Sequence, residues 1–191
     1  MMQNKIIDCL TTIKTENGYR KLMASDFKSF GKNVKIFPQA KFVNPEVIEI
    51  GDYSMIDDFT FLYGGQGIKI GKHVHIASFV SIVGGGELEM GDYSALAAGS
   101  RLVTGSNLHQ GGFHMTASVP NNQQNIKRRR MYIGKDVVIG TNSIVHPCIT
   151  VGDGAILGSN SLALKDLEHW TIYVGSPCKK IGMREKIRNF D

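Results

Sequence analysis

The sequence predicts an all-β protein in which most of the chain winds into a parallel β-solenoid. One observation is a repeat: residues 30–49, 50–69, 70–89 and 90–109 each begin with an apolar residue followed by Gly. Another is a spacing of six between apolar residues, which resumes after a gap at Ile133 with a period of eighteen instead of twenty. This spacing fits neither an amphipathic helix, with a period of about 3.6, nor a single alternating strand, with a period of about 2.

A spacing of six fits a coil with three flat sides, in which one small aliphatic residue per side points to the axis. Gly, Asp, Asn and Ser suit the corners, because they tolerate the backbone of tight turns. Stacked coils pair as parallel strands about 4.8 Å apart and bury their apolar faces against their neighbours. An antiparallel sandwich would not need the same residue class at every sixth position. The predicted inward residues are Ile50, Ile56, Leu62, Ile70, Ile76, Ile82, Met90, Leu96, Leu102, Ile133, Ile139, Val145, Val151, Leu157 and Ala163.

Each twenty-residue coil carries two residues more than three sixes. We expect the spare pair to bulge at one corner, near residues 67–69 in one coil and 87–89 in the next.

The chain of 191 residues is expected to form one domain with three parts. Residues 1–29 lack the sixfold pattern and are predicted to form a helical cap, with apolar residues at helical spacing over 5–14. Residues 30–168 form the solenoid, interrupted by an excursion loop at 110–132, and residues 169–191 form a connection and a short helix. Long loops inside compact domains are usually functional or disordered, and this one has histidines at its start and basic residues at its end.

Composition narrows the function classes. The sequence contains no run of eighteen apolar residues that could span a membrane, and its first twenty residues are too polar for a secretory signal. Its three cysteines make no disulfide framework. A cytoplasmic protein is therefore expected. The net charge is +5, and the basic cluster at 127–130 is not interleaved with aromatic residues as in a single-strand nucleic-acid binder. A small anionic ligand or a sugar nucleotide is the predicted partner, and nucleic acid is not.

Two stretches carry a family resemblance, residues 133–167 and the closing YVGSPCKKI at 173–181. With them, roughly residues 20–185 resemble the hexapeptide-repeat acyltransferases, which fold as left-handed β-helices. The chain is similar to the maltose/galactoside acetyltransferase branch, and closer to sugar acyltransferases of bacterial surface-polysaccharide (lipopolysaccharide) clusters. The motifs shared with the latter lie at residues 31–34, 56–59 and 115–120.

The resemblance implies an acetyltransferase that moves an acetyl group from acetyl-CoA to a hydroxyl or amino group of a sugar, with no metal. The acceptor is a nucleotide-linked, lipid-linked or free sugar, and O- and N-transfer both stay open. The resemblance also implies a homotrimer whose active sites lie between subunits, with the long loop of one subunit reaching its neighbour.

His109, where the loop departs, matches the position of the family's catalytic His, and His114 is the alternative. The implied role is general base: a His takes the proton of the acceptor as it attacks the thioester, because its pKa lies near working pH. A backbone N–H is the expected donor to the tetrahedral intermediate.

Four further positions match cofactor-binding positions of the family: Thr141, Ser159, Lys165 and Lys179. The resemblance implies contacts of Thr141 and Ser159 with coenzyme A. Lys165 retains the Lys of a family Thr-Lys pair whose Thr is Leu164 here, and Lys179 matches a basic residue near the nucleotide phosphates, where a flexible ammonium acts as a point charge.

Two other function classes are alternatives to the acyltransferase. The spacing of His109 and His114 also occurs in zinc-dependent γ-type carbonic anhydrases, which share this architecture and need a third ligand. A neighbouring subunit would have to provide it, as His73 or His75, and metal content tests this alternative. The other alternative is an inactive trimeric scaffold, which the excursion with its histidines argues against.

Overall fold

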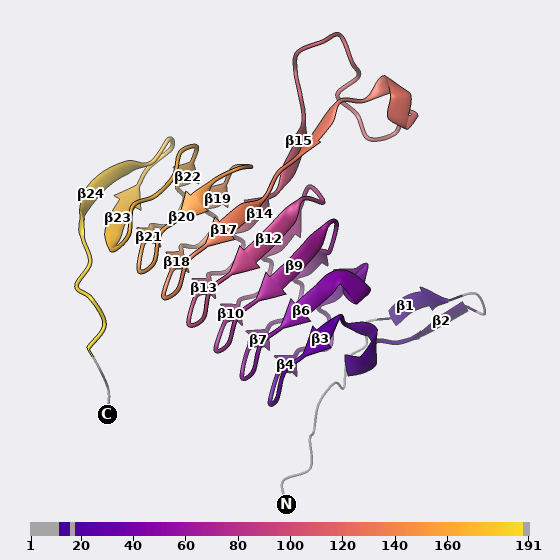
Figure 1. Ribbon diagram of the computed structural model, residues 1–191, viewed down its shortest axis with the longest axis horizontal. Helices are drawn as coiled ribbons and strands as arrows, with labels where there is room; N and C mark the ends of the chain where they lie inside the picture. The colour runs from indigo at the N-terminus through magenta and orange to yellow at the C-terminus, as the bar shows by residue number, and fades with distance from the viewer. Residues whose placement is uncertain (1–11, 16–17, 189–191) are drawn as a thin grey trace, which may run out of the picture.

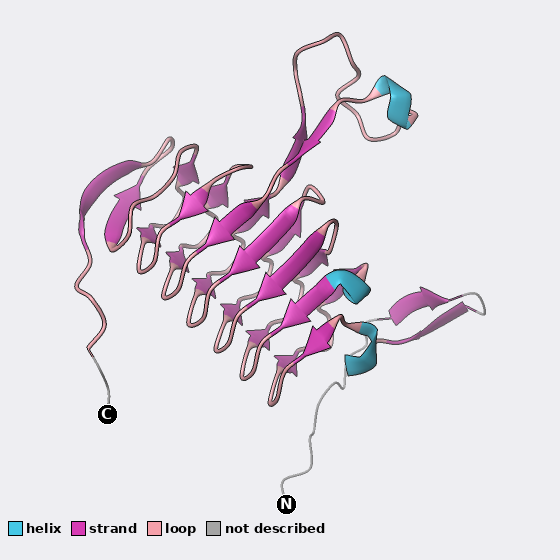
Figure 2. Cartoon of the chain, viewed as in Figure 1, coloured by secondary structure: helices cyan, strands magenta, loops and turns pink. Residues whose placement is uncertain are grey.

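The computed structural model describes residues 12–15 and 18–188, with side chains from Lys21 onward. These residues form an elongated solenoid with almost no helix (Figures 1 and 2). Successive coils stack so that each side of the solenoid is a parallel sheet, as the repeat predicts.

The coils are numbered here by their strands, and each sheet is named by its first and last strand. Coils one to four run over β3–β5, β6–β8, β9–β11 and β12–β14, coils five and six over β17–β19 and β20–β22, and coil seven contains β23. The β3–β20 sheet contains β3 (Ser29–Phe30), β6 (Ile48–Ile50), β9 (Gly67–Ile70), β12 (Glu87–Met90), β17 (Met131–Ile133) and β20 (Thr150–Val151). The β4–β24 sheet contains β4 (Lys35–Ile36), β7 (Met55–Ile56), β10 (His75–Ile76), β13 (Ala95–Leu96), β18 (Val138–Ile139), β21 (Ile156–Leu157), β23 (Thr171–Val174) and β24 (Lys179–Met183). The β5–β22 sheet contains β5 (Lys41–Val43), β8 (Phe61–Tyr63), β11 (Ser81–Val83), β14 (Arg101–Val103), β19 (Ile144–Val145) and β22 (Leu162–Ala163).

The core contains the inward ladders that the sixfold spacing predicts and a further ladder of Ile48, Ile68, Leu88 and Met131 that it does not. Every predicted inward residue is buried, and ladder members such as Ile56, Ile76 and Leu96 pair directly across β7, β10 and β13. Burial of one such side chain stabilises the fold by about 1.5–3 kcal/mol, so the ladders are a main source of the stability of the solenoid.

Three corners join the sheets in every full coil. In coil two, corner 1 is residues 51–54, corner 2 is residues 57–60 and corner 3 is residues 64–66. In most coils, corners 1 and 2 each place one residue in the left-handed region, and in several coils this residue is aromatic rather than Gly. The rings of Tyr53, His73 and Tyr93 stack at 4.9 and 5.0 Å, and those of Phe59 and Phe79 at 5.1 Å. This stacking offsets part of the backbone cost of a positive φ.

The spare residues of the twenty-residue coils do not form the predicted bulge at 67–69 and 87–89, because these residues belong to the regular strands β9 and β12. The added length lies between the inward residues Leu62 and Ile70, and between Ile82 and Met90, where corner 3 is flanked by strands longer than those of coil five. Gly65 and Gly85 adopt φ of +54° and +69° there, and a Cβ on Gly65 would overlap the backbone of Gly85. The tight backbone contact between neighbouring coils explains why glycines occupy this corner.

Neither end of the described chain forms the short helix that the sequence analysis expects. Part of the helix predicted over 5–14 lies outside the described residues, but residues 12–14 belong to an antiparallel hairpin of β1 (Thr12–Thr15) and β2 (Gly18–Lys21). β-Branched Thr and Ile in β1 favour a strand. Before the first coil, the chain makes only a 3-10 turn, η1 (Ala24–Asp26).

At the other end, the stack continues beyond residue 168, because β23 pairs in parallel with β21. β24 then turns back and pairs antiparallel with β23, and residues 184–188 form no helix. Pairing with β24 satisfies the backbone groups at the strand edge of the last coil, which a detached helix would leave unpaired.

The excursion leaves the stack at corner 3 of coil four. It contains β15 (Gly105–Asn107), η3 (Asn121–Gln123) and β16 (Ile126–Arg128), with β15 and β16 antiparallel. This hairpin projects from the stack, and its tip lies well away from the coils (Figure 1). A short 3-10 turn, η2 (Pro45–Val47), occupies the same corner in coil one.

Candidate active site

The two predicted base residues, His109 and His114, lie in the tip of the excursion. Both are exposed. Backbone bonds shape the tip: Leu108 N donates to Asn125 O at 2.8 Å, and His114 N donates to Gln123 O at 3.0 Å. Hydrogen bonds therefore fix the main chain of this loop, while the two imidazoles are exposed.

Three of the four predicted cofactor residues follow one line along corner 2. Thr141 and Ser159 are exposed residues of the corner in coils five and six, and Asn160 N donates to Thr141 O at 2.8 Å across the two coils. Lys179 begins β24 beside this corner, because Cys178 N donates to Leu162 O at 2.8 Å. We call Thr141, Ser159 and Lys179 the corner-2 row.

Lys165 does not belong to this row. It lies at corner 3 of coil six, on the other side of β22, and is exposed. The same corner in coil five holds His146, whose backbone N donates to Ala163 O at 3.0 Å. In a single chain, the structure thus brings Thr141, Ser159 and Lys179 together and separates Lys165 and both excursion histidines from them.

A titratable pair that the sequence analysis did not single out lies further along corner 2. Asp57 begins the corner in coil two, and His75 begins β10 in coil three. His75 Nε2 and Asp57 Oδ2 are 3.0 Å apart, with side-chain exposures of 43% and 23%. The signal was present in the repeat: in the twenty-residue alignment, Asp57 follows inward Ile56 and His75 precedes inward Ile76, so the two stand diagonally on neighbouring coils.

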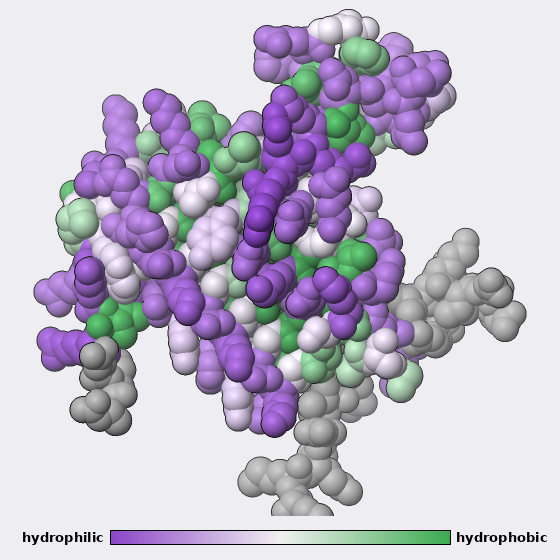
Figure 3. All heavy atoms as spheres, viewed as in Figure 1, coloured by the Kyte–Doolittle hydropathy of each residue, from purple (hydrophilic) through white to green (hydrophobic). Residues whose placement is uncertain are grey.

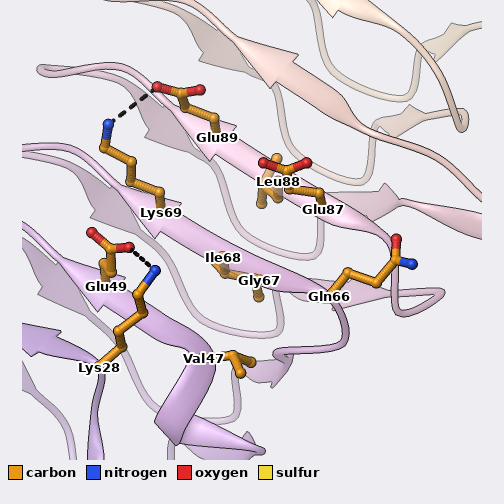
Figure 4. Close-up of a pocket in the computed structure, with 10 residues that line it drawn as sticks. All are labelled: Lys28, Val47, Glu49, Gln66, Gly67, Ile68, Lys69, Glu87, Leu88 and Glu89. Carbon is orange, nitrogen blue, oxygen red and sulfur yellow. Dashed lines mark hydrogen bonds and ion pairs between the residues drawn. The ribbon is translucent and has the colours of Figure 1, made fainter.

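A shallow hollow lies on the outer face of the β3–β20 sheet (Figure 4), on a side of the molecule where Figure 3 shows many hydrophilic side chains. Its charges are paired across the strands: Lys28 with Glu49 at 2.7 Å and Lys69 with Glu89 at 3.3 Å. A hydrogen bond from Arg130, followed by one from Lys69, holds the pKa of Glu89 below its usual range. None of the predicted site residues lines this hollow.

Two other kinds of site are absent from residues 12–15 and 18–188. No group of three His, Cys, Asp or Glu side chains is placed to hold a metal ion. No helix in these ranges is long and apolar enough to cross a membrane.

Comparison with known proteins identifies the class of this chain. The bacterial transferase hexapeptide (six repeats) model matches residues 130–162. The dTDP-4-amino-4,6-dideoxy-D-glucose acyltransferase of Escherichia coli is 36% identical over 161 residues, which cover 84% of each chain. The chain therefore belongs to the hexapeptide-repeat acyltransferases, and its predicted left-handed parallel β-helix and acyltransferase class are confirmed.

Two relatives show the range of chemistry near this chain. AntD, an N-acyltransferase from Bacillus cereus solved with dTDP and 3-hydroxybutyryl-CoA, has a TM-score of 0.79 at 35% identity and covers 84% of this chain and 85% of its own. A chloramphenicol acetyltransferase of Agrobacterium fabrum (strain C58 / ATCC 33970) is 50% identical over only 52 residues, 27% of this chain and 25% of that protein.

Proposed function

We propose that this enzyme transfers an acyl group from an acyl-CoA to the amino group of a dTDP-linked deoxysugar. The observation that carries the proposal is the similarity to the E. coli dTDP-4-amino-4,6-dideoxy-D-glucose acyltransferase, which extends over 84% of both chains. AntD, similar over the same share of this chain, is an N-acyltransferase that was solved with dTDP. Of the two acceptor groups left open by the sequence, these relatives favour the amine.

Coenzyme A is proposed to lie along the corner-2 row. Thr141 and Ser159 present hydroxyls in successive coils, and the exposed Lys179 ammonium suits the phosphates as a point charge. Acetyl-CoA is the predicted donor. The 3-hydroxybutyryl-CoA bound in AntD makes a longer acyl group the alternative to test.

A trimer with intersubunit sites is proposed for the assembly. The excursion projects from corner 3 and the corner-2 row lies elsewhere on the coil, so one active site that uses both requires the loop of a second subunit. The outer face of the β4–β24 sheet supports such packing, because its outward residues are apolar over six coils, apart from His75. They are Met55, Ala95, Val138, Ile156 and Ile172.

The excursion also suits an anionic acceptor. Residues 105–130 contain no Asp or Glu and end in Lys127, Arg128, Arg129 and Arg130. A loop of this charge attracts the diphosphate of a nucleotide sugar. His109 or His114 on this loop is the base proposed from the family pattern, and the cytoplasm, which holds acyl-CoA, is the proposed compartment.

The test is a thiol-release assay on the purified enzyme. We expect turnover with dTDP-4-amino-4,6-dideoxyglucose and acetyl-CoA or 3-hydroxybutyryl-CoA, and little with the 4-hydroxy analogue of the sugar. Chloramphenicol is the competing acceptor in a parallel reaction. Acetylation of chloramphenicol without turnover of any amino sugar would contradict the proposal.

A further inference from the structure

We infer that His75, oriented by Asp57, takes the proton from the acceptor nitrogen during acyl transfer. The inference rests on the proposed function and deepens it, because it moves the base from the excursion to the coil stack. His75 is the proposed catalytic residue, and Asp57 is a positioning residue.

The pair has the geometry of an oriented base. The Nε2–H of a neutral His75 donates to Asp57 Oδ2 over 3.0 Å, which leaves the lone pair on Nδ1. A carboxylate in this position selects the tautomer and stabilises the imidazolium that forms. Both backbones are fixed on their coils, since Asp57 N donates to Ile76 O at 2.9 Å and His75 N to Ser94 O at 3.1 Å.

Asp57 is the charged group that faces His75. The neighbours of His75 in the sheet are Met55 on β7 and Ala95 on β13, and both are uncharged. With the residues that the structure describes, neither His109 nor His114 makes a side-chain hydrogen bond or ion pair that would orient its ring. The two sets of histidines therefore differ in preorganisation.

The distance from Lys179 to the pair along corner 2 also matches the length of the cofactor. From β23, beside Lys179, to β10 the sheet makes four steps, through β21, β18 and β13. At about 4.8 Å per step this is about 19 Å. An extended pantetheine arm spans a distance of this order, so phosphates held at Lys179 direct the thioester toward coils four and three.

Coil four leaves room for the reacting groups beside His75. Its residues at this position are small: Ala95 on β13, then Ala97, Ala98 and Gly99 at corner 2. Coils two and three instead carry Phe59 and Phe79, and Phe79 is 62% exposed. Side-chain bulk along corner 2 thus falls sharply just after the coil that holds His75.

The transfer step balances with His75 as proton carrier. The amine nitrogen attacks the thioester carbonyl carbon, the C–N bond forms and the carbonyl π electrons move to oxygen. Nδ1 of His75 takes one proton from the nitrogen, and Asp57 stabilises the resulting imidazolium. The intermediate collapses, the C–S bond breaks, and the departing thiolate receives that proton to give free coenzyme A.

The experiment compares His75→Gln with His109→Gln and His114→Gln in the amine assay. We expect His75→Gln to lower kcat by about a hundredfold or more, the usual size of a general-base effect, with the KM for acyl-CoA nearly unchanged. His75→Ala should regain activity when imidazole is added, which a merely structural role would not produce. Asp57→Asn should lose less kcat, again with the KM for acyl-CoA nearly unchanged, because the amide oxygen can still accept from Nε2–H but carries no charge to stabilise the imidazolium.

His169→Gln is the matched control, since His169 lies at corner 1 and accepts a hydrogen bond from Asp153 N at 2.9 Å. Thermal melting of every variant tests folding. Full kcat in folded His75→Gln, together with a large loss in His109→Gln or His114→Gln, would overturn the inference and leave the proposed function intact. Absence of amine transfer by the wild-type enzyme would instead refute the proposed function and this role with it.

Discussion

In the coil stack each coil donates backbone hydrogen bonds to the next, and every coil contributes to continuous buried ladders. The excursion shares neither property: residues 109–118 are exposed, and two three-residue strands join them to the stack. A side chain of the stack therefore has a fixed position in a single chain. A side chain at the tip of the excursion gains one only by packing against something else.

This contrast affects how catalytic residues are recognised. The family pattern points to His109 and His114 of the excursion, which are exposed and have no orienting side-chain contact among the described residues. The stack contains a histidine that is already oriented by a carboxylate. Preorganised groups need no reorganisation when the reaction begins, which is why the difference matters for rate.

Shortening the excursion is the strongest way to break the comparison. Replacement of residues 108–125 by Gly-Gly keeps β15 and β16 as a hairpin, because Asn107 and Ile126 already face each other. We expect the melting temperature to change little, while kcat/KM for the nucleotide sugar falls by about tenfold or more, or 1.4 kcal/mol. A large drop in melting temperature would show that the excursion stabilises the stack.

Two glycines with similar backbones sharpen the comparison. Gly65 in the stack and Gly112 in the excursion have φ of +54° and +71°, so Ala is strained at both by about 1–2 kcal/mol. A Cβ on Gly65 would also overlap Gly85, whereas nothing lies within 4 Å of one on Gly112. We expect Gly65→Ala to lower the melting temperature clearly more than Gly112→Ala. Equal melting temperatures would contradict tight contact between coils at corner 3.

Substitution of Lys179, the last residue of the corner-2 row, tests whether this row binds acyl-CoA. Lys179→Ala should raise the KM for acyl-CoA about tenfold, because a hydrogen bond to a charged group contributes about 1.5–3 kcal/mol. Lys180→Ala is the control: this neighbouring ammonium lies 2.7 Å from Glu168, an ion pair that raises the Lys180 pKa. Steady-state kinetics with acyl-CoA as the varied substrate measures both. An unchanged KM in Lys179→Ala would remove this residue from the cofactor site.

The smallest expected effect is on the stability of the fold at acidic pH. A hydrogen bond from the backbone N–H of Lys32, followed by the ammonium of Lys72, holds the pKa of Asp52 below its usual range. Because the folded pKa is depressed, this contribution to stability is complete above the ordinary Asp pKa and is lost as pH falls through the folded value. Asp52→Asn should therefore lose slightly less melting temperature between pH 6 and pH 3 than the wild type. The excursion has no carboxylate of its own to titrate in this range.

Sequence reasoning succeeded where a residue repeats and failed where it occurs once. The inward ladders were predictable because every coil places an apolar residue in the same environment. Residues such as Ile76 and Leu157 can be buried there only by facing the axis of the solenoid. The hairpin at 12–21 and the strand β24 were not predictable, because strand pairing at a stack end depends on an edge that no periodicity reports. The contact between Asp57 and His75 needed the register between coils as well as the position within a coil.

All four departures from the eighteen-residue coil lie between an inward residue of the β5–β22 sheet and the next inward residue of the β3–β20 sheet, at corner 3 and in the strands beside it. Corners 1 and 2 keep four residues each from the first coil to the sixth. Sequence can thus be inserted at corner 3 without shifting the register of any sheet or disturbing the line from Lys179 to His75. In evolutionary terms, corner 3 is the place where loops of new length can arise while the three sheets keep their alignment.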